Sequence, residues 1–129
     1  MNKTICIDFD GVIHRHSKGW QDGTVYDLAV DGALDSIRAL QDRGYAVVVS
    51  TARKELIPVA NWMRGQGYIE RKITVDSHQH KDVPFWNSTT TVLITNRKIP
   101  AIAYIDDRGI TFRNNWSEIL DIFKGEENE

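Results

Sequence analysis

Short apolar runs alternate with segments of helical periodicity along this chain. Continuous apolar runs of roughly four to eight residues are typical of strands buried on both faces of a parallel sheet. The runs that fit this description are KTICIDF (3–9), YAVVVS (45–50), KITV (72–75) and AIAYIDD (101–107). ITF (110–112) is expected to form an edge strand, whereas TTVLIT (90–95) is compatible with either a strand or a helix.

Helical signals occupy the segments between these runs. The stretch DGALDSIRALQDRGY has apolar residues at helical spacing and a glycine stop signal, Gly44. A second helix is expected after residue 53, with Pro58 near its start, where proline is tolerated. A third is expected after Asn115, which forms a capping-box pattern with Glu118.

This order of elements predicts the architecture. Strands that alternate with helices are typical of an α/β fold with a doubly wound, mostly parallel sheet. We expect a single domain over residues 1–124, with a long loop or small hairpin over 11–29 and an acidic, disordered tail over 125–129. In such sheets ligands bind at the carboxyl ends of the strands.

Acidic and hydroxyl side chains gather at three of these expected strand ends. In chain order they are Asp8 and Asp10, Ser50 and Thr51, and Asp106 and Asp107. Four carboxylates in one place repel one another unless a cation lies between them. Mg²⁺ prefers oxygen ligands and usually combines one or two carboxylates with a phosphate. The pattern therefore points to a Mg²⁺ site that acts on a phosphate ester.

Each of these side chains has a role in such a reaction. Asp8 can attack phosphorus as a nucleophile, and Asp10 can act as general acid and then as general base. Thr51 can donate a hydrogen bond to a phosphoryl oxygen, while Asp106 and Asp107 hold the metal from across the crevice.

Two further features complete this interpretation. Gly11 lets the chain turn sharply past the phosphate. A cation is needed against the phosphate, and Lys98, which precedes Pro100, is the best candidate, with Lys72 and Lys81 as alternatives.

The motifs resemble those of the haloacid dehalogenase-like (HAD) phosphohydrolase superfamily. IDFDGVI is similar to the first motif of the family, VVVST followed by Ala-Arg to the second, and AYIDDR to the fourth. The resemblance covers about residues 3–112. It implies a phospho-aspartyl intermediate on Asp8, with Asp10 as the acid/base catalyst. The metal would be held by Asp106 and by the backbone carbonyl of Asp10. Thr51 would bind the phosphate, and Lys98 would be the lysine of the third motif.

The resemblance also bears on the kind of substrate. The segments 11–31 and 76–96, where the family inserts its cap domain, are too short for a folded cap. A small capless member with an open site is implied, and open sites in the family often serve large substrates or borrow a lid from a partner subunit. A nucleotide, a nucleic-acid end, a sugar phosphate and a phosphoprotein all stay open as substrates, and a homo-oligomer is compatible with this arrangement.

Other side chains near these motifs have alternative interpretations. Arg53, Arg108 and His14 can contact the substrate, but structural salt bridges explain the arginines equally well. The pairs HRH (14–16) and HQH (78–80) suggest a zinc site only weakly, because no cysteine accompanies them. Trp20 and Trp86 lie in expected loops near the site and could stack on a base.

Composition limits the classes of function. Lys+Arg is 16 and Asp+Glu is 18, a net charge of −2, which argues against a general nucleic-acid or membrane-surface binder. Cys6 is the only cysteine and lies in an apolar run, so we expect a core residue. Neither a targeting signal nor a membrane span is recognisable, and a cytoplasmic protein is expected.

Two alternatives to a phosphatase belong to other functional classes. A response-regulator receiver has its acid pair near the first strand and its phosphorylated aspartate on a middle strand, whereas here the pair closes the last long strand. A catalytically inactive HAD-like binding domain is the second alternative, and the presence of all the acidic motif residues argues against it.

Overall fold

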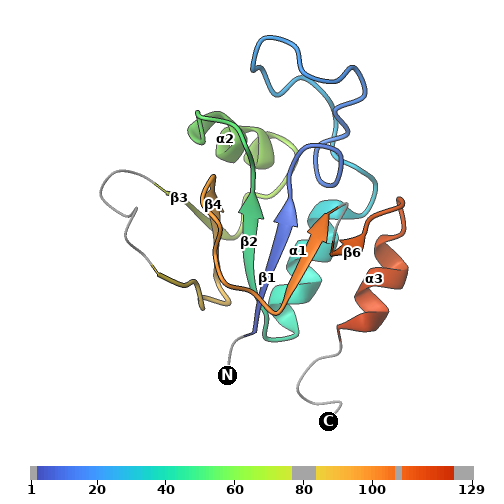
Figure 1. Cartoon of the computed structure of the whole chain (residues 1–129), viewed down its shortest axis with the longest axis vertical. Coiled ribbons are helices and arrows are strands. Elements are labelled where there is room, and N and C mark those ends of the chain that lie inside the picture. Colours follow the sequence, from blue (N-terminus) through green and yellow to red (C-terminus); the bar gives the residue numbers. More distant parts are fainter. Residues whose placement is uncertain (1–2, 77–83, 107–108, 124–129) are drawn as a thin grey trace.

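The computed structural model describes residues 3–76, 84–106 and 109–123. Within these residues one parallel sheet has the strand order β3-β4-β2-β1-β5-β6, and three helices accompany it (Figure 1). The elements are, in chain order, β1 (Thr4–Asp8), α1 (Ala33–Asp42), β2 (Ala46–Ser50), α2 (Ile57–Gly65), β3 (Lys72–Val75), β4 (Thr91–Thr95), β5 (Ala103–Asp106), β6 (Ile110–Thr111) and α3 (Trp116–Ile122).

The chain winds outward from β1 in both directions, which confirms the predicted doubly wound α/β fold. It passes first to β2 and then to the edge strand β3, turns back to β4 between these two, and crosses the sheet to β5 and β6. The ambiguous run at residues 90–95 is a strand, β4, because it is buried between β2 and β3 and pairs with both. The expected edge strand at 110–112 is β6.

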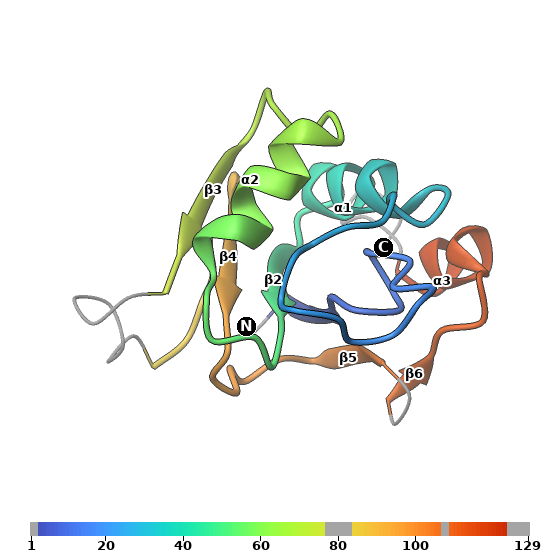
Figure 2. The same cartoon turned by 90° about the horizontal axis from the view of Figure 1, so that it is seen from above.

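The two faces of the sheet are covered differently. Odd-numbered residues of β1 and β2, such as Ile5 and Val47, pack with all three helices in the main core. The opposite face buries Cys6 and Val48 under Ile99, which lies in the connection between β4 and β5. Figure 2 shows the helices on one side of the sheet and this connection on the other. Right-handed crossovers require this arrangement, because the direction of winding reverses after β3, the edge strand.

Turn and cap residues account for most of the helix boundaries. Gly44 has a φ of 94° and ends the α1 region, and Pro58 occupies the first turn of α2, as predicted. The capping box at α3 is wrong in detail. Asn115 is the N-cap residue, but its side chain makes no cap hydrogen bond, because Oδ1 accepts the backbone N–H of Arg113 instead.

Residues 10–30 form an irregular excursion above the carboxyl ends of β1 and β2 (Figure 1). Its first part is tight, since the carbonyl of Phe9 accepts the N–H groups of Val12, Ile13 and His14. A bridge between His14 and Ala29 brings the first and last parts of the excursion together. The excursion carries no regular helix or strand, in agreement with its lack of periodicity. Among the described residues, no helix is long and apolar enough to cross a membrane.

The buried centre of the sheet gives a stability prediction. Ile5 is fully buried in β1 and lies between β2 and β5. We expect Ile5→Ala to lower the free energy of unfolding by about 2–5 kcal/mol, because the mutation leaves a cavity in the core. The matched control is Ile122→Ala, at a position on α3 that is 59% exposed, for which the change should stay within about 0.5 kcal/mol. Equal losses in urea unfolding of the two variants would contradict the assigned core.

Candidate functional site

A row of polar side chains crosses the carboxyl edge of the sheet. Asp8 pairs in register with Ser50, and Ser50 pairs with Thr95. Asp106 follows the pair Ile7–Ile105 on the other side of β1. Because residues in register share a face of the sheet, these side chains lie on the same face as Cys6 and Val48. The parallel register therefore gathers residues from three distant parts of the sequence, as the motifs predicted.

A backbone amide close to the start of β6 orients Asp106. Its carboxylate accepts the backbone N–H of Gly109, with 2.7 Å between Oδ1 and N. A Cβ atom at Gly109 would lie 2.1 Å from the carbonyl oxygen of Tyr104, so only glycine fits this close approach. Asp107 and Arg108, predicted as a metal ligand and a substrate contact, lie outside the described residues.

Asp10 is held by a buried arginine and a buried histidine. Arg53, which is 5% exposed, donates from Nε to Oδ2 and from Nη2 to Oδ1 of Asp10, each at 3.0 Å. His14 lies 2.8 Å from Oδ1 through its Nδ1. The Nε2 atom of His14 accepts the N–H of Asp27, so the proton of a neutral ring is on Nδ1 and is donated to Asp10. Both carboxylate oxygens of Asp10 are thus engaged.

These contacts set the ionisation of Asp10. Partial burial raises the pKa of its carboxyl group, but the hydrogen bonds from Arg53 and His14, together with the charge of Arg53, outweigh burial and hold the pKa below its ordinary value. His16 adds to this effect from 3.9 Å away. Asp10 is therefore a carboxylate at neutral pH.

The side chains of His14 and Arg53 are placed to support Asp10. His14 is fully buried and both of its ring nitrogens have partners. Its side chain therefore supports Asp10 and does not contact a substrate. Arg53 also donates to the carbonyl of Gly23 at 2.7 Å and lies against the rings of Phe9 and Trp20. Arg53 thus forms the structural salt bridge that was one of its two predicted roles. Its contact with a substrate stays a prediction.

The two hydroxyl residues after Val49 have different surroundings. Ser50 is half-buried and lies in the polar row beside Asp8. Thr51 is buried, and its Oγ1 accepts the backbone N–H of Arg53 at 3.1 Å. This contact fixes the oxygen and leaves the hydroxyl hydrogen to be donated elsewhere. Thr51 is therefore an oriented donor one residue beyond the end of β2.

The direction of the strands distinguishes among the candidate lysines. Lys98 follows β4 at the carboxyl edge and is exposed, with Nζ 5.6 Å from the ring centroid of Tyr104. Lys72 begins β3 and so lies at the amino edge of this parallel sheet, away from Asp8. Lys81 lies outside the described residues. Lys98 is thus the candidate that shares an edge with Asp8.

A second polar cluster lies at the same edge and was missed by the sequence analysis. Asp76 directly follows β3, and its Oδ2 accepts hydrogen bonds from Thr95 Oγ1 at 2.7 Å and from Arg97 Nε at 2.5 Å. The Asp76 side chain is 5% exposed. An acidic residue at the end of KITV was the available signal. Asp76 also bears on the receiver alternative, because a receiver carries its phosphorylated aspartate at the end of a middle strand. Asp76 does follow a strand, but β3 is at the edge of the sheet.

The oxygen donors at the edge fit magnesium. Asp8 and Asp106 lie on neighbouring strands and face the same side of the sheet, and Mg²⁺ is commonly held by one or two carboxylates with a phosphate. No group of three His, Cys, Asp or Glu side chains able to hold a metal occurs within the described ranges. His78 and His80 are outside those ranges, and His14 already has two partners.

Cys6 is not part of this chemistry. Burial, with a smaller contribution from the charge of Asp106, raises the pKa of its thiol to about 12, so the sulfur stays protonated. It lies in the second core cluster, as predicted for a core residue.

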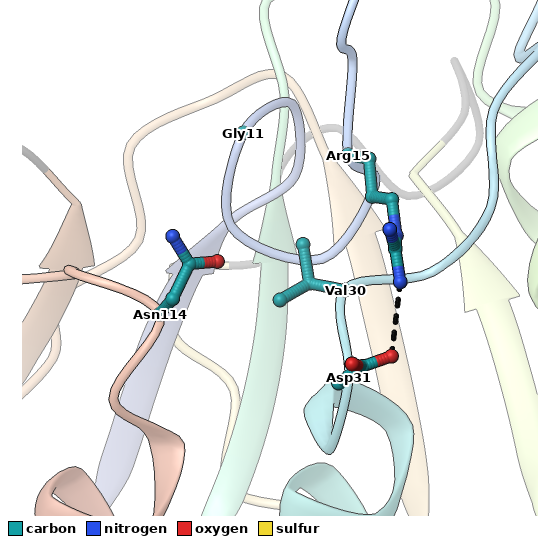
Figure 3. Close-up of a pocket in the computed structure, with 5 residues that line it drawn as sticks. All are labelled: Gly11, Arg15, Val30, Asp31 and Asn114. Carbon is teal, nitrogen blue, oxygen red and sulfur yellow. Dashed lines mark hydrogen bonds and ion pairs between the residues drawn. The ribbon is translucent and has the colours of Figure 1, made fainter.

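Gly11 forms the turn that follows Asp10, with a φ of 87° that favours glycine. It lines an open pocket of about 420 Å³ with Arg15, Val30, Asp31 and Asn114 (Figure 3). The pocket is bordered by the ion pair between Arg15 and Asp31, with 2.9 Å between Nη2 and Oδ1. The predicted sharp turn at Gly11 is thus observed.

The ion pair between Asp10 and Arg53 makes a testable contribution to stability. We expect Asp10→Asn to lower the free energy of unfolding at pH 7 by about 3 kcal/mol, because a buried guanidinium loses its partner. This is the lower end of the usual range, since the Asp10 side chain is 23% exposed. The control is Asp31→Asn, which breaks the exposed pair with Arg15 and should change stability by less than about 1 kcal/mol.

The pH dependence of this effect has a definite sign. The pKa of Asp10 is lower in the folded protein than its ordinary value of 3.8, so the ionised form stabilises the fold. The stabilisation is complete above that value and is lost as the pH falls through the lower, folded pKa. Urea unfolding should show a constant difference between wild type and Asp10→Asn above about pH 5 and a shrinking one below about pH 4. A difference that grows on acidification would contradict the assignment.

Comparison of the chain with models of protein families, with curated proteins and with solved structures finds no match. The resemblance drawn above therefore rests on the motifs themselves and on the positions of their side chains. These are Asp8 and Asp106 on neighbouring strands, Thr51 beyond β2 and the Asp10 carboxylate bound by Arg53.

Proposed function

We propose that this protein is a Mg²⁺-dependent phosphohydrolase that cleaves a phosphomonoester through a phospho-aspartyl intermediate on Asp8. The observation that carries the proposal is the register of the sheet, which aligns Asp8 with Ser50 and places Asp106 on the neighbouring strand and on the same face. Acidic and hydroxyl groups at the carboxyl edge of a parallel sheet are where ligands bind in this architecture.

The chemistry divides between two aspartates. A carboxylate oxygen of Asp8 attacks phosphorus, and the bond from phosphorus to the ester oxygen breaks. Water then attacks the acyl phosphate and regenerates Asp8, with inorganic phosphate as the product. Bound Mg²⁺, held by Asp8, Asp106 and the backbone carbonyl of Asp10, would neutralise charge on the phosphate. Thr51 donates to a phosphoryl oxygen, and Lys98 supplies positive charge from the same edge.

Asp10 is best suited to the second step. As a carboxylate with a lowered pKa, it can accept a proton from the water that attacks the acyl phosphate. Donation of a proton to the leaving group in the first step requires protonated Asp10, which the contacts with Arg53 and His14 disfavour. Esters with good leaving groups, such as aryl phosphates, are therefore expected to react fastest.

The contacts of Asp10 favour one second candidate, a HAD-like domain that binds phosphorylated ligands without cleaving them. Both oxygens of Asp10 are engaged by Arg53 and His14, which a binding domain could use purely for stability. The two functions differ in turnover. A binding domain retains phosphate or phosphate esters but releases no product, whatever residue stands at position 8.

Replacing the nucleophile tests the proposal directly. Asp8→Asn should lower the Mg²⁺-dependent hydrolysis of p-nitrophenyl phosphate by more than about 1,000-fold, because the amide cannot attack phosphorus. The control is Asp35→Asn, at an exposed position on α1, which should retain wild-type activity. Removal of Mg²⁺ with a chelator should abolish turnover by the wild type, and turnover that survives in Asp8→Asn would identify a different nucleophile.

The neighbouring hydroxyl groups give a second test. Thr51→Val should lower kcat/KM for p-nitrophenyl phosphate by about 10- to 100-fold, since one hydrogen bond to a charged oxygen is lost. Thr51→Ser should recover most of that loss. Ser50→Ala is the matched comparison and should change kcat/KM by less than about threefold if Thr51 is the phosphate ligand. The opposite order of the two effects would assign phosphate binding to Ser50.

A further inference from the structure

Trp20 is a large aromatic side chain held at the surface beside the candidate site. It is 62% exposed, yet its ring covers the guanidinium group of Arg53, with 5.2 Å between Cζ and the ring centroid. Arg53 is the residue that binds Asp10, so the indole ring lies one side chain away from the Asp-x-Asp turn. Trp20 thus combines contact with the site and a large accessible surface.

The segment that presents Trp20 is ordered by its own hydrogen bonds. The hydroxyl of Tyr26 accepts the N–H of Lys18 and donates to the carbonyl of Gly19, each at 2.8 Å. Arg53 donates to the carbonyl of Gly23 from the sheet side. Because these bonds already fix the backbone around the indole, a ligand that stacks on it requires little further ordering of the protein.

The indole borders an open pocket of about 610 Å³. The lining residues are Lys18, Trp20, Gln21, Asp22, Thr24 and Tyr26. The pocket therefore combines aromatic surface with several side chains that donate or accept hydrogen bonds. An aromatic ring that carries polar edges and a hydroxylated sugar fits such a lining.

We propose that the substrate is a nucleoside monophosphate, whose base stacks on Trp20 while its phosphate lies at Asp8. This inference rests on the proposed function, because the reacting phosphate fixes the position of the rest of the molecule. Asp8 attacks phosphorus, the bond between phosphorus and the 5′ oxygen of the sugar breaks, and that oxygen leaves as the hydroxyl of the nucleoside with a proton from solvent. Water then hydrolyses the acyl phosphate and releases inorganic phosphate. Stacking tolerates any base, so discrimination among the four bases is expected to be weak.

Charge favours a single nucleotide over a nucleic-acid strand. A strand is bound by a positively charged groove that follows its backbone. The pocket beside Trp20 carries one cation, Lys18, and one anion, Asp22, among its lining residues. The chain as a whole has a net charge of −2. The base and sugar of one nucleotide match this small, nearly neutral surface.

AMP and ribose 5-phosphate provide a matched pair of substrates, because they share the ester that is cleaved and differ in the base. The wild type should show a higher kcat/KM for AMP, and Trp20→Leu should lower the ratio of the two kcat/KM values by roughly 5- to 100-fold. Leucine keeps an apolar cover over Arg53 but has no aromatic face. Trp20→Phe should retain most of the ratio, and Leu28→Ala, at another exposed apolar position in the segment, should leave it unchanged. A ratio that Trp20→Leu does not alter would overturn the inference.

Calorimetric binding to Asp8→Asn separates this inference from the proposed function. With Mg²⁺ present, this variant should bind AMP more tightly than ribose 5-phosphate, and the double variant with Trp20→Leu should lose the difference. That result supports base stacking even if the wild type hydrolyses neither compound, in which case the phosphatase proposal alone fails. Equal affinity for the two compounds would overturn base stacking even if both are hydrolysed. Binding of a 5′-phosphorylated oligonucleotide more than about tenfold tighter than AMP would overturn the assignment to a mononucleotide.

Discussion

The in-register parallel pairing of β1 with β2 and β5 is the constraint on which the rest of the structure depends. It sets Asp8 opposite Ser50 and puts Asp106 one residue beyond the pair Ile7–Ile105. A slip of one residue in β1 would turn Asp8 toward the helices and Ile7 toward the opposite face, with the loss of both the core and the polar row. The same apolar pairing that stabilises the sheet therefore positions the candidate chemistry.

Arg53 connects the sheet to the excursion above it. Its guanidinium binds Asp10 with two hydrogen bonds, donates to the carbonyl of Gly23 and lies under Trp20. A single buried cation thus keeps one aspartate ionised and holds the segment that presents the exposed indole. Both the ionisation of Asp10 and the position of the segment that carries Trp20 therefore depend on Arg53.

Much of the fold could be predicted from the chain, because buried parallel strands appear as continuous apolar runs and glycines such as Gly44 mark helix ends. The carboxyl-edge rule then placed Asp8, Thr51 and Asp106 together. The partners of Asp10 could not be found in this way, since the bidentate bond from Arg53 depends on how the irregular segment folds back. The sequence did place an acidic residue, Asp76, after KITV, but its partners Thr95 and Arg97 depend on β3 lying beside β4, which the sequence did not show. Among the described residues, the second face is covered by parts of the connecting segments, such as Ile99 and Trp86, and this was also not evident from periodicity.

The central claim is that Asp8 becomes covalently phosphorylated during turnover. The most direct measurement is rapid acid quenching of the wild-type protein with a phosphate ester and Mg²⁺, followed by digestion and mass spectrometry of the peptide that contains Asp8. We expect a phosphoryl group on Asp8 that is removed by hydroxylamine, because acyl phosphates react with this nucleophile. Turnover with a phosphoryl group on a different residue would contradict the account.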